Sequence, residues 1–181
     1  MKIKVSVVIP AVCLAAVLFV GCGKKEENTL SVRQTRTQVV TLPAFHASPP
    51  AALAGKTVVP GGRVYVDGLN NSKLATVKVK SEDGFDINGW AFDNKAKSAP
   101  EILFIELSPI KGGQRFYAAA ERGEREDLAK AFNKPELKKA AYMLKADIKN
   151  VSAGEYLINI IQMADGNPIQ ASTGIKINKM N

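Results

Sequence analysis

Apolar and polar residues alternate in several stretches between residues 63 and 177, a pattern typical of strands with one buried face. In 74–80, for example, Ala75, Val77 and Val79 alternate with polar residues. Gly, Asn and Pro residues fall between the stretches and favour turns. Short strands separated by turns predict an antiparallel β-sandwich. We expect eight strands, at 63–67, 74–80, 85–92, 102–105, 115–120, 142–148, 156–163 and 169–177.

One stretch follows a helical period instead. In 124–132, the side chains of Leu128, Ala131 and Phe132 would share one face of a helix, and Pro135 would end it. No alternation of strands and helices recurs along the chain, so a mixed α/β fold is not expected. The pattern predicts an all-β domain with one short helix.

Residues 22–61 show no sustained periodicity and are punctuated by prolines at positions 43, 49, 50 and 60. Such a stretch cannot bury enough apolar surface to offset the entropy lost on ordering. We therefore predict a flexible tether at 22–61 in front of a folded domain at 62–178. The only histidine, His46, lies in this tether and is expected to be solvated.

The N-terminus reads as an export signal. Residues 1–4 carry two lysines, 5–20 are apolar, and Gly21 precedes Cys22. The apolar run is shorter than the roughly 20 residues that span a membrane. We predict a signal peptide at 1–21.

The last residues of this signal, LFVGC at 18–22, resemble the lipobox of bacterial lipoproteins. That resemblance implies cleavage before Cys22 and acylation of its thiol and amine, which would anchor the chain in a membrane. Gly23 is not the aspartate that retains such lipoproteins in the inner membrane, so the implied location is the cell envelope at the outer membrane. The alternative is a plain signal peptide in which Cys22 has no role.

The amino-acid composition excludes several classes of scaffold and catalytic site. The 181 residues include a single His and two Cys, both cysteines lying within the first 22 residues. This excludes a disulfide-rich scaffold, a Cys/His zinc site and a histidine-dependent hydrolase triad in the folded part. The net charge of +8 is modest, and export makes a nucleic-acid partner unexpected. We predict no catalytic residues, no metal and no cofactor.

Three motifs resemble a small immunoglobulin-like domain of bacterial cell-envelope proteins: GWAFD at 89–93, REDL at 125–128 and AGEYL at 153–157. The resemblance covers 62–178 and implies an immunoglobulin-like β-sandwich without an active site. Its motif residues are expected to be structural; they are Gly89, Trp90, Asp93, Arg125, Asp127, Gly154 and Tyr156.

Two of these residues allow a more specific expectation. A bulge at Gly89 would turn Trp90 into the sandwich core, the alternative being that Trp90 is a surface platform for stacking sugars. Tyr156, at the start of a strand, is expected to form a tyrosine corner, in which its hydroxyl bonds to the backbone upstream. An ordinary core tyrosine is the alternative.

Charged residues form two groups. The mixed charges at 122–127 are expected to be a solvated face. The one basic cluster could bind an anionic glycan or a lipid headgroup, or could simply be soluble surface; it contains Lys134, Lys138, Lys139, Lys145 and Lys149.

Together these features predict a non-catalytic lipoprotein that acts as a binding or adaptor module in the cell envelope, with the membrane and an envelope protein or glycan as partners. The alternative is a structural or assembly component of an envelope complex.

Overall fold

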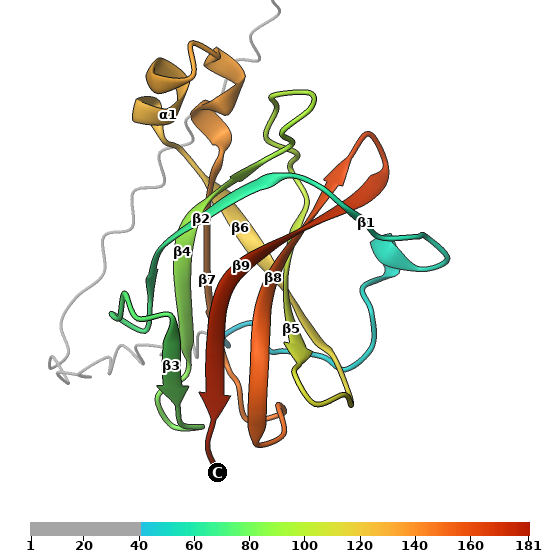
Figure 1. Cartoon of the computed structure of the whole chain (residues 1–181), viewed down its shortest axis with the longest axis vertical. Helices are drawn as coiled ribbons and strands as arrows, with labels where there is room; N and C mark the ends of the chain where they lie inside the picture. The colour runs from blue at the N-terminus through green and yellow to red at the C-terminus, as the bar shows by residue number, and fades with distance from the viewer. Residues whose placement is uncertain (1–40) are drawn as a thin grey trace, which may run out of the picture. The chain divides into compact units, whose positions relative to one another are not determined.

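The strands dominate the computed structural model, which describes residues 41–181 (Figure 1). They are β1 (Val59–Pro60), β2 (Arg63–Leu69), β3 (Thr76–Val79), β4 (Phe85–Phe92), β5 (Leu103–Pro109), β6 (Phe116–Gly123), β7 (Ala141–Ala146), β8 (Gly154–Ala164) and β9 (Asn167–Lys179). One α-helix, α1 (Glu126–Ala131), and two short 3-10 helices, η1 (Ala51–Leu53) and η2 (Pro135–Lys139), complete this part of the chain. The predicted all-β fold with one short helix is confirmed.

The strands form one curled sheet whose two halves face each other. One half has the order β2-β4-β7-β6 and the other contains β5-β8-β9. Strand β6 joins the halves, because its residues 116–120 pair with β5 and its residues 121–123 pair with β7. This is the strand grouping of an immunoglobulin-like sandwich. The sheet is not wholly antiparallel as predicted, since β1 and β3 both run parallel to β9.

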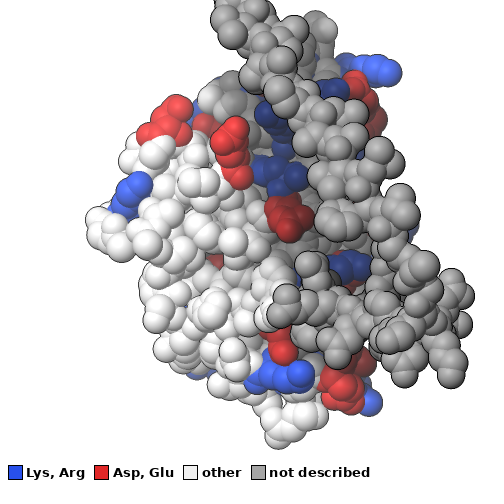
Figure 2. Space-filling model, turned by 180° about the vertical axis from the view of Figure 1, so that it is seen from behind, with Lys and Arg blue, Asp and Glu red and all other residues white. Residues whose placement is uncertain are grey.

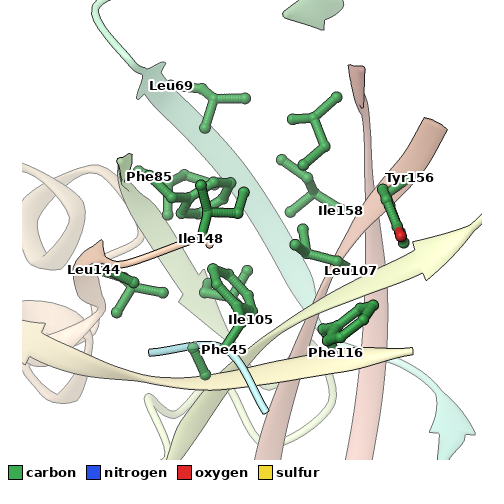
Figure 3. Packing of buried hydrophobic residues seen from close by; sticks show 14 of the residues in the cluster. Phe45, Leu69, Phe85, Ile105, Leu107, Phe116, Leu144, Ile148, Tyr156 and Ile158 are labelled. Atoms are coloured by element: carbon green, nitrogen blue, oxygen red, sulfur yellow. The ribbon is translucent and has the colours of Figure 1, made fainter. Parts of the chain in front are cut away.

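The core lies between the two halves of the sheet (Figure 3). Phe85 of β4 faces Ile105 and Leu107 of β5 and Ile158 of β8 across it, and Ile87 of β4 belongs to the same buried cluster. These residues occupy alternate positions on their strands, so the pleat directs them all inward. Burying large apolar side chains is the main favourable term in folding such a domain, at roughly 25 cal/mol per Å².

The N-terminal boundary of the domain differs from the prediction. Phe45 is 0% exposed and its ring lies edge-on to Phe85, with centroids 5.1 Å apart. The backbone N–H of Phe45 donates to the carbonyl of Asp147 at 3.4 Å, while His46 and Tyr117 exchange two backbone bonds of 2.9 Å. The buried ring and these hydrogen bonds offset the entropy that is lost when this segment is ordered. Residues 43–46, within the predicted tether, therefore belong to the folded domain.

More of the predicted tether also packs on the sheet. Leu53 of η1 lies against Phe104, Tyr117 and Ile161 on the outer face of β5, β6 and β8. Strand β1 then pairs with β9. The exposed side chain of His46 agrees with its predicted solvation. The predicted signal peptide and Cys22 lie outside the described residues.

Helix α1 and η2 cover part of the outer face of β4. Leu128 of α1 and Leu137 of η2 pack with Ala140 on Phe92, which is 0% exposed although it points away from the sandwich core. The helix is shorter than the predicted 124–132. These two helices form a small second layer that covers Phe92 at one end of the outer face of β4.

Candidate binding surface

A row of aromatic rings stands on the outer face of β2 and β4. Since Phe85 and Ile87 point inward, Trp90 and Phe92 point outward, and Tyr65 of β2 pairs with Trp90. The Trp90 ring is stacked with Tyr65 at a centroid distance of 5.9 Å and with Phe92 at 5.5 Å. Phe132, next to α1, lies edge-on to Trp90 at 6.2 Å. We call these residues, together with Arg63, the aromatic shelf.

Burial decreases along the shelf towards the edge of the sheet. Phe92 is fully covered, Trp90 is half-buried, and Tyr65 is 57% exposed. The predicted place of Trp90 in the sandwich core is therefore wrong. The irregularity in the pairing lies in β2, between Val66 and Gly68, so β4 is not turned at Gly89 and Trp90 stays on the outer face.

Gly89 serves a different purpose from the predicted bulge. A Cβ atom at this position would collide with the backbone oxygen of Tyr65 and would lie 2.8 Å from the hydroxyl of Tyr142. The missing side chain lets the Tyr142 ring cross β4, and its hydroxyl donates to the Tyr65 carbonyl at 3.3 Å. Burial raises the pKa of Tyr142. Gly89 thus allows β7 to brace the strand that carries Tyr65.

The guanidinium of Arg63 lies over two aromatic rings of the shelf and has no polar partner among residues 41–181. Its guanidinium carbon is 6.0 Å from the centroid of the Trp90 ring and 5.1 Å from that of Phe132. Arg115, Arg122 and Arg125 all donate hydrogen bonds to protein groups. The backbone of Arg63 pairs with that of Phe92, but no hydrogen bond or ion pair within residues 41–181 involves its guanidinium.

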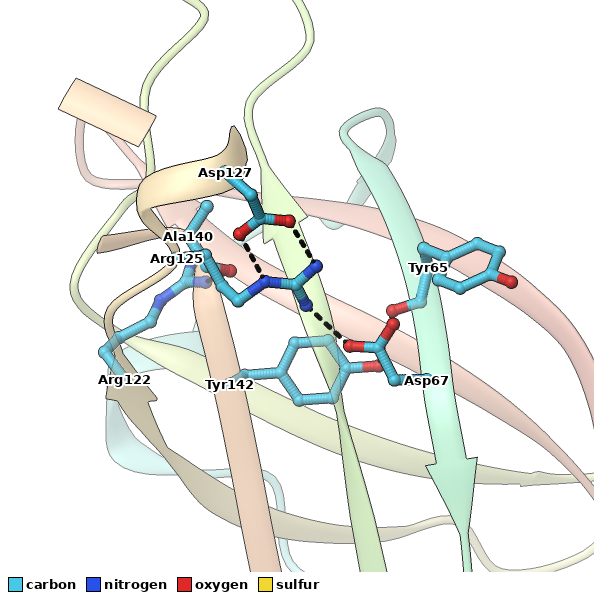
Figure 4. Close-up of polar contacts among 7 residues, drawn as sticks. All are labelled: Tyr65, Asp67, Arg122, Arg125, Asp127, Ala140 and Tyr142. Carbon is cyan, nitrogen blue, oxygen red and sulfur yellow. Dashed lines mark hydrogen bonds and ion pairs between the residues drawn. The ribbon is translucent and has the colours of Figure 1, made fainter. Parts of the chain in front are cut away.

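Arg125 fastens the start of α1 to β2 (Figure 4). Its guanidinium makes two bonds of 2.8 Å to the Asp127 carboxylate and one of 2.7 Å to Asp67, at the irregular point of β2. The hydrogen bonds to Asp127 raise the pKa of Arg125. Arg125 and Asp127, predicted as structural motif residues, hold the helix that shelters the shelf.

This pair should make stability depend on pH. Hydrogen bonds from Arg125 lower the pKa of Asp127 to about 2 from an ordinary value of 3.8. A carboxyl with a lowered pKa in the folded state stabilises fully above its unfolded pKa and loses that contribution as the pH falls through the folded one. Between pH 3.8 and about 2, the midpoint of urea unfolding of the native chain should therefore fall more than that of Asp127→Asn. Parallel pH profiles of the two proteins would contradict this expectation.

Arg122 is not part of the predicted solvated face. It points inward from β6 at the end of the sandwich, and burial lowers its pKa to about 10. It donates to four acceptors from both halves of the sheet: the carbonyls of Pro100 (2.8 Å), Ala91 (2.9 Å) and Ala140 (3.2 Å) and Oε1 of Gln162 (3.0 Å). Arg122 closes the end of the core by bonding to backbone carbonyls and to the Gln162 side chain, which together come from both halves of the sheet.

A buried carboxylate that the sequence pattern did not reveal lies on the opposite half of the sheet. Glu106 of β5 is 1% exposed and accepts hydrogen bonds from Asn159 of β8 at 2.8 Å and from Gln170 of β9 at 2.7 Å. Arg115 approaches it at 3.3 Å. Because these donors come from β8 and β9, Glu106 ties three strands of this half together.

Three further motif positions have structural roles. The Tyr156 hydroxyl donates to the carbonyl of Ser152 at 3.0 Å, which is the hydrogen bond expected for a tyrosine corner. Gly154, with φ of 151°, starts β8 in a conformation that favours glycine. Asp93 closes the turn after β4, where its carboxylate accepts from the N–H of Lys95 at 2.8 Å.

The five predicted lysines do not form one patch. Lys138 is paired with Glu126 at 2.8 Å, Lys145 with Asp86 at 3.4 Å and Lys149 with Asp147 at 3.3 Å. Lys134, Lys138 and Lys139 lie around η2, whereas Lys145 and Lys149 lie at the far end of β7. On the visible part of the face in Figure 2, basic and acidic groups are interspersed.

A depression of about 430 Å³ lies between residues 41–43 and residues of β6 and β7. Leu42 and Met143, which are 47% and 50% exposed, line it with Ala119. Among residues 41–181, no group of three His, Cys, Asp or Glu side chains could hold a metal ion. No helix in the same residues is long and apolar enough to cross a membrane.

Comparison of the chain with protein-family models, with curated proteins and with solved structures found no match. The resemblance to envelope immunoglobulin-like domains and to lipoproteins stays a prediction from the sequence.

Proposed function

We propose that this chain is a lipid-anchored, non-catalytic binding module of a bacterial cell envelope, and that the aromatic shelf is its binding surface. The lipobox-like end of the signal supports an anchor at Cys22, and Gly23 supports sorting to the outer membrane. A small domain held at a membrane in this way acts by contact with a partner in the envelope.

The observation that carries the proposal is the exposure of Tyr65 at the end of an ordered aromatic row. Tyr65 is braced against Trp90 and still presents more than half of its surface to solvent. Rigid aromatic side chains supply contact area at little cost in side-chain entropy, and tyrosine, tryptophan and arginine dominate binding energies at interfaces. Arg63, Tyr65 and Trp90 bring these three residue types together.

The proposal is tested by fractionating cells that produce variants of the chain. Cys22→Ser should move the protein from the membrane fraction to the soluble fraction, since it removes the acylated thiol. In pull-downs on isolated envelopes, Tyr65→Ala should weaken retention by about tenfold or more, as expected for a residue contributing about 2 kcal/mol to binding.

The matched control is Ile102→Ala, which shortens another exposed apolar side chain away from the shelf. It should leave retention unchanged, and all variants should keep the thermal midpoint of the native chain. Equal retention of Tyr65→Ala and Ile102→Ala would reject the shelf as the binding surface.

The depression beside Leu42 and Met143 favours a second candidate, a structural or assembly component. Such a component should co-purify with its complex at fixed stoichiometry. Met143→Asp would then release it, whereas Tyr65→Ala would not.

A further inference from the structure

We propose that the aromatic shelf binds an acidic sugar, with a pyranose ring stacked on the outward face of Tyr65 and a carboxylate of that sugar held by Arg63. This inference rests on the proposed function of the shelf and names the chemical class of its ligand.

The first argument is the position of the Tyr65 ring. One of its faces is stacked on Trp90 with an interplanar angle of 18°, and β2 is the last strand on this side of the described sheet. No further strand is hydrogen-bonded to β2 on that side, and Tyr65 is 57% exposed. The face of an aromatic ring carries the negative part of its quadrupole, which attracts the weakly positive C–H groups on the flat side of a pyranose.

The second argument is that the Arg63 guanidinium has no carboxylate partner among residues 41–181. Its guanidinium is positioned by two aromatic rings, Trp90 and Phe132, but is not neutralised by any carboxylate among residues 41–181. A guanidinium is weakly hydrated and offers a planar fork that fits a carboxylate through two hydrogen bonds. An anionic ligand group would supply the partner that this part of the protein does not.

The third argument is the spacing of the two residues. Arg63 and Tyr65 lie two positions apart on β2, and so point to the same side about 7 Å apart along the strand. A uronic acid carries its carboxylate at the rim of the ring, so a sugar stacked on Tyr65 would bring that group to the side of the sheet on which Arg63 lies. An acidic peptide would satisfy Arg63, but most of its side chains lack a flat C–H face for Tyr65.

The test uses the full mature chain in detergent and follows the fluorescence of Trp90, the only tryptophan. Polygalacturonate should change this emission, and its apparent affinity should fall as salt is added. Neutral dextran and polyglutamate should bind at least about tenfold more weakly than polygalacturonate. Arg63→Ala should weaken polygalacturonate binding by about 10- to 100-fold, the range for a hydrogen bond to a charged group.

Conservative variants separate chemistry from folding. Tyr65→Phe should retain binding and Tyr65→Ala should lose it, because only the ring is needed. Arg63→Lys should restore part of the affinity, since it keeps the charge but loses the fork. Lys111→Ala, in the β5–β6 turn, is the charge-matched control and should bind as the native chain does.

The results of these experiments distinguish failure of this inference from failure of the proposed function. Equal binding of polyglutamate, or equal binding of dextran, would overturn the acidic sugar as ligand. If polygalacturonate does not bind while Tyr65→Ala still loses retention on envelopes, this inference fails and the proposed function stands. If Tyr65→Ala also keeps its retention, the proposed function fails.

Discussion

Replacing Phe45 by alanine is expected to lower the free energy of unfolding by about 3–5 kcal/mol. The ring is fully buried between the two halves of the sheet and contacts Phe85 edge-on. Its loss leaves a cavity and frees the segment that bonds to Asp147 and to β6. Single domains are stable by only about 5–15 kcal/mol, so this one change should bring the domain close to unfolding.

Urea unfolding followed by Trp90 fluorescence measures this effect. Leu42→Ala is the matched control, because Leu42 lies on the same segment but is 47% exposed. It should cost much less than Phe45→Ala. Similar values for the two variants would show that residues 43–46 are not part of the cooperative folding unit.

Gly89→Ala should be the other strongly destabilising change, at about 3 kcal/mol, the upper part of the range for overpacking. The new methyl group would meet the carbonyl of Tyr65 and the hydroxyl of Tyr142, and the first of these belongs to the backbone and cannot rotate away. Strand β2 would have to move away from β4. Thermal unfolding monitored by circular dichroism measures the loss.

Gly123→Ala is the matched control for Gly89→Ala. Gly123 is also a strand glycine, and a Cβ there would lie at an ordinary contact distance of 3.4 Å from Ala141. It should change the thermal midpoint little. An equal loss at both positions would mean that the close approach at Gly89 is not the cause.

The strands were predictable because alternation is a local property of the sequence. The expected strand at 85–92 has the bounds of β4, and the other seven expected strands each overlap an observed one. Strands with only one face on the core show a period of two without knowledge of their partners, whereas β5 and β8, buried on both faces, show continuous apolar runs. Only β1 was missed, since two residues cannot show a period.

The residues that were misplaced depend on distant parts of the chain. Phe45 lies in a proline-rich stretch without a pattern, and its burial is decided by Phe85. Arg122 sits in a run of mixed charges, but its acceptors come from residues up to 40 positions away. Trp90 is partly covered by the helix layer. The sequence pattern predicts the helix but does not show that it packs on β4.

The candidate site was predictable in part. Trp90 was recognised as a possible sugar platform, but Tyr65 and Arg63, which make the shelf accessible and charged, were not singled out. Their signal was present, because both lie on the face of 63–67 opposite Val64 and Val66. What the sequence does not contain is the pairing of β2 with β4, which brings Tyr65 against Trp90.

The docking of residues 43–46 also determines how the domain would bear load. The chain enters beside Asp147, past the end of β7, whereas Trp90 on the shelf pairs with Ala141 at the start of the same strand. With an anchor at Cys22 and a polymer held at the shelf, tension would run lengthwise along β7. Ala44 and His46 are held by isolated bridges to Asp147 and Tyr117 and not by a strand ladder, so the first part to yield would be the segment locked by Phe45.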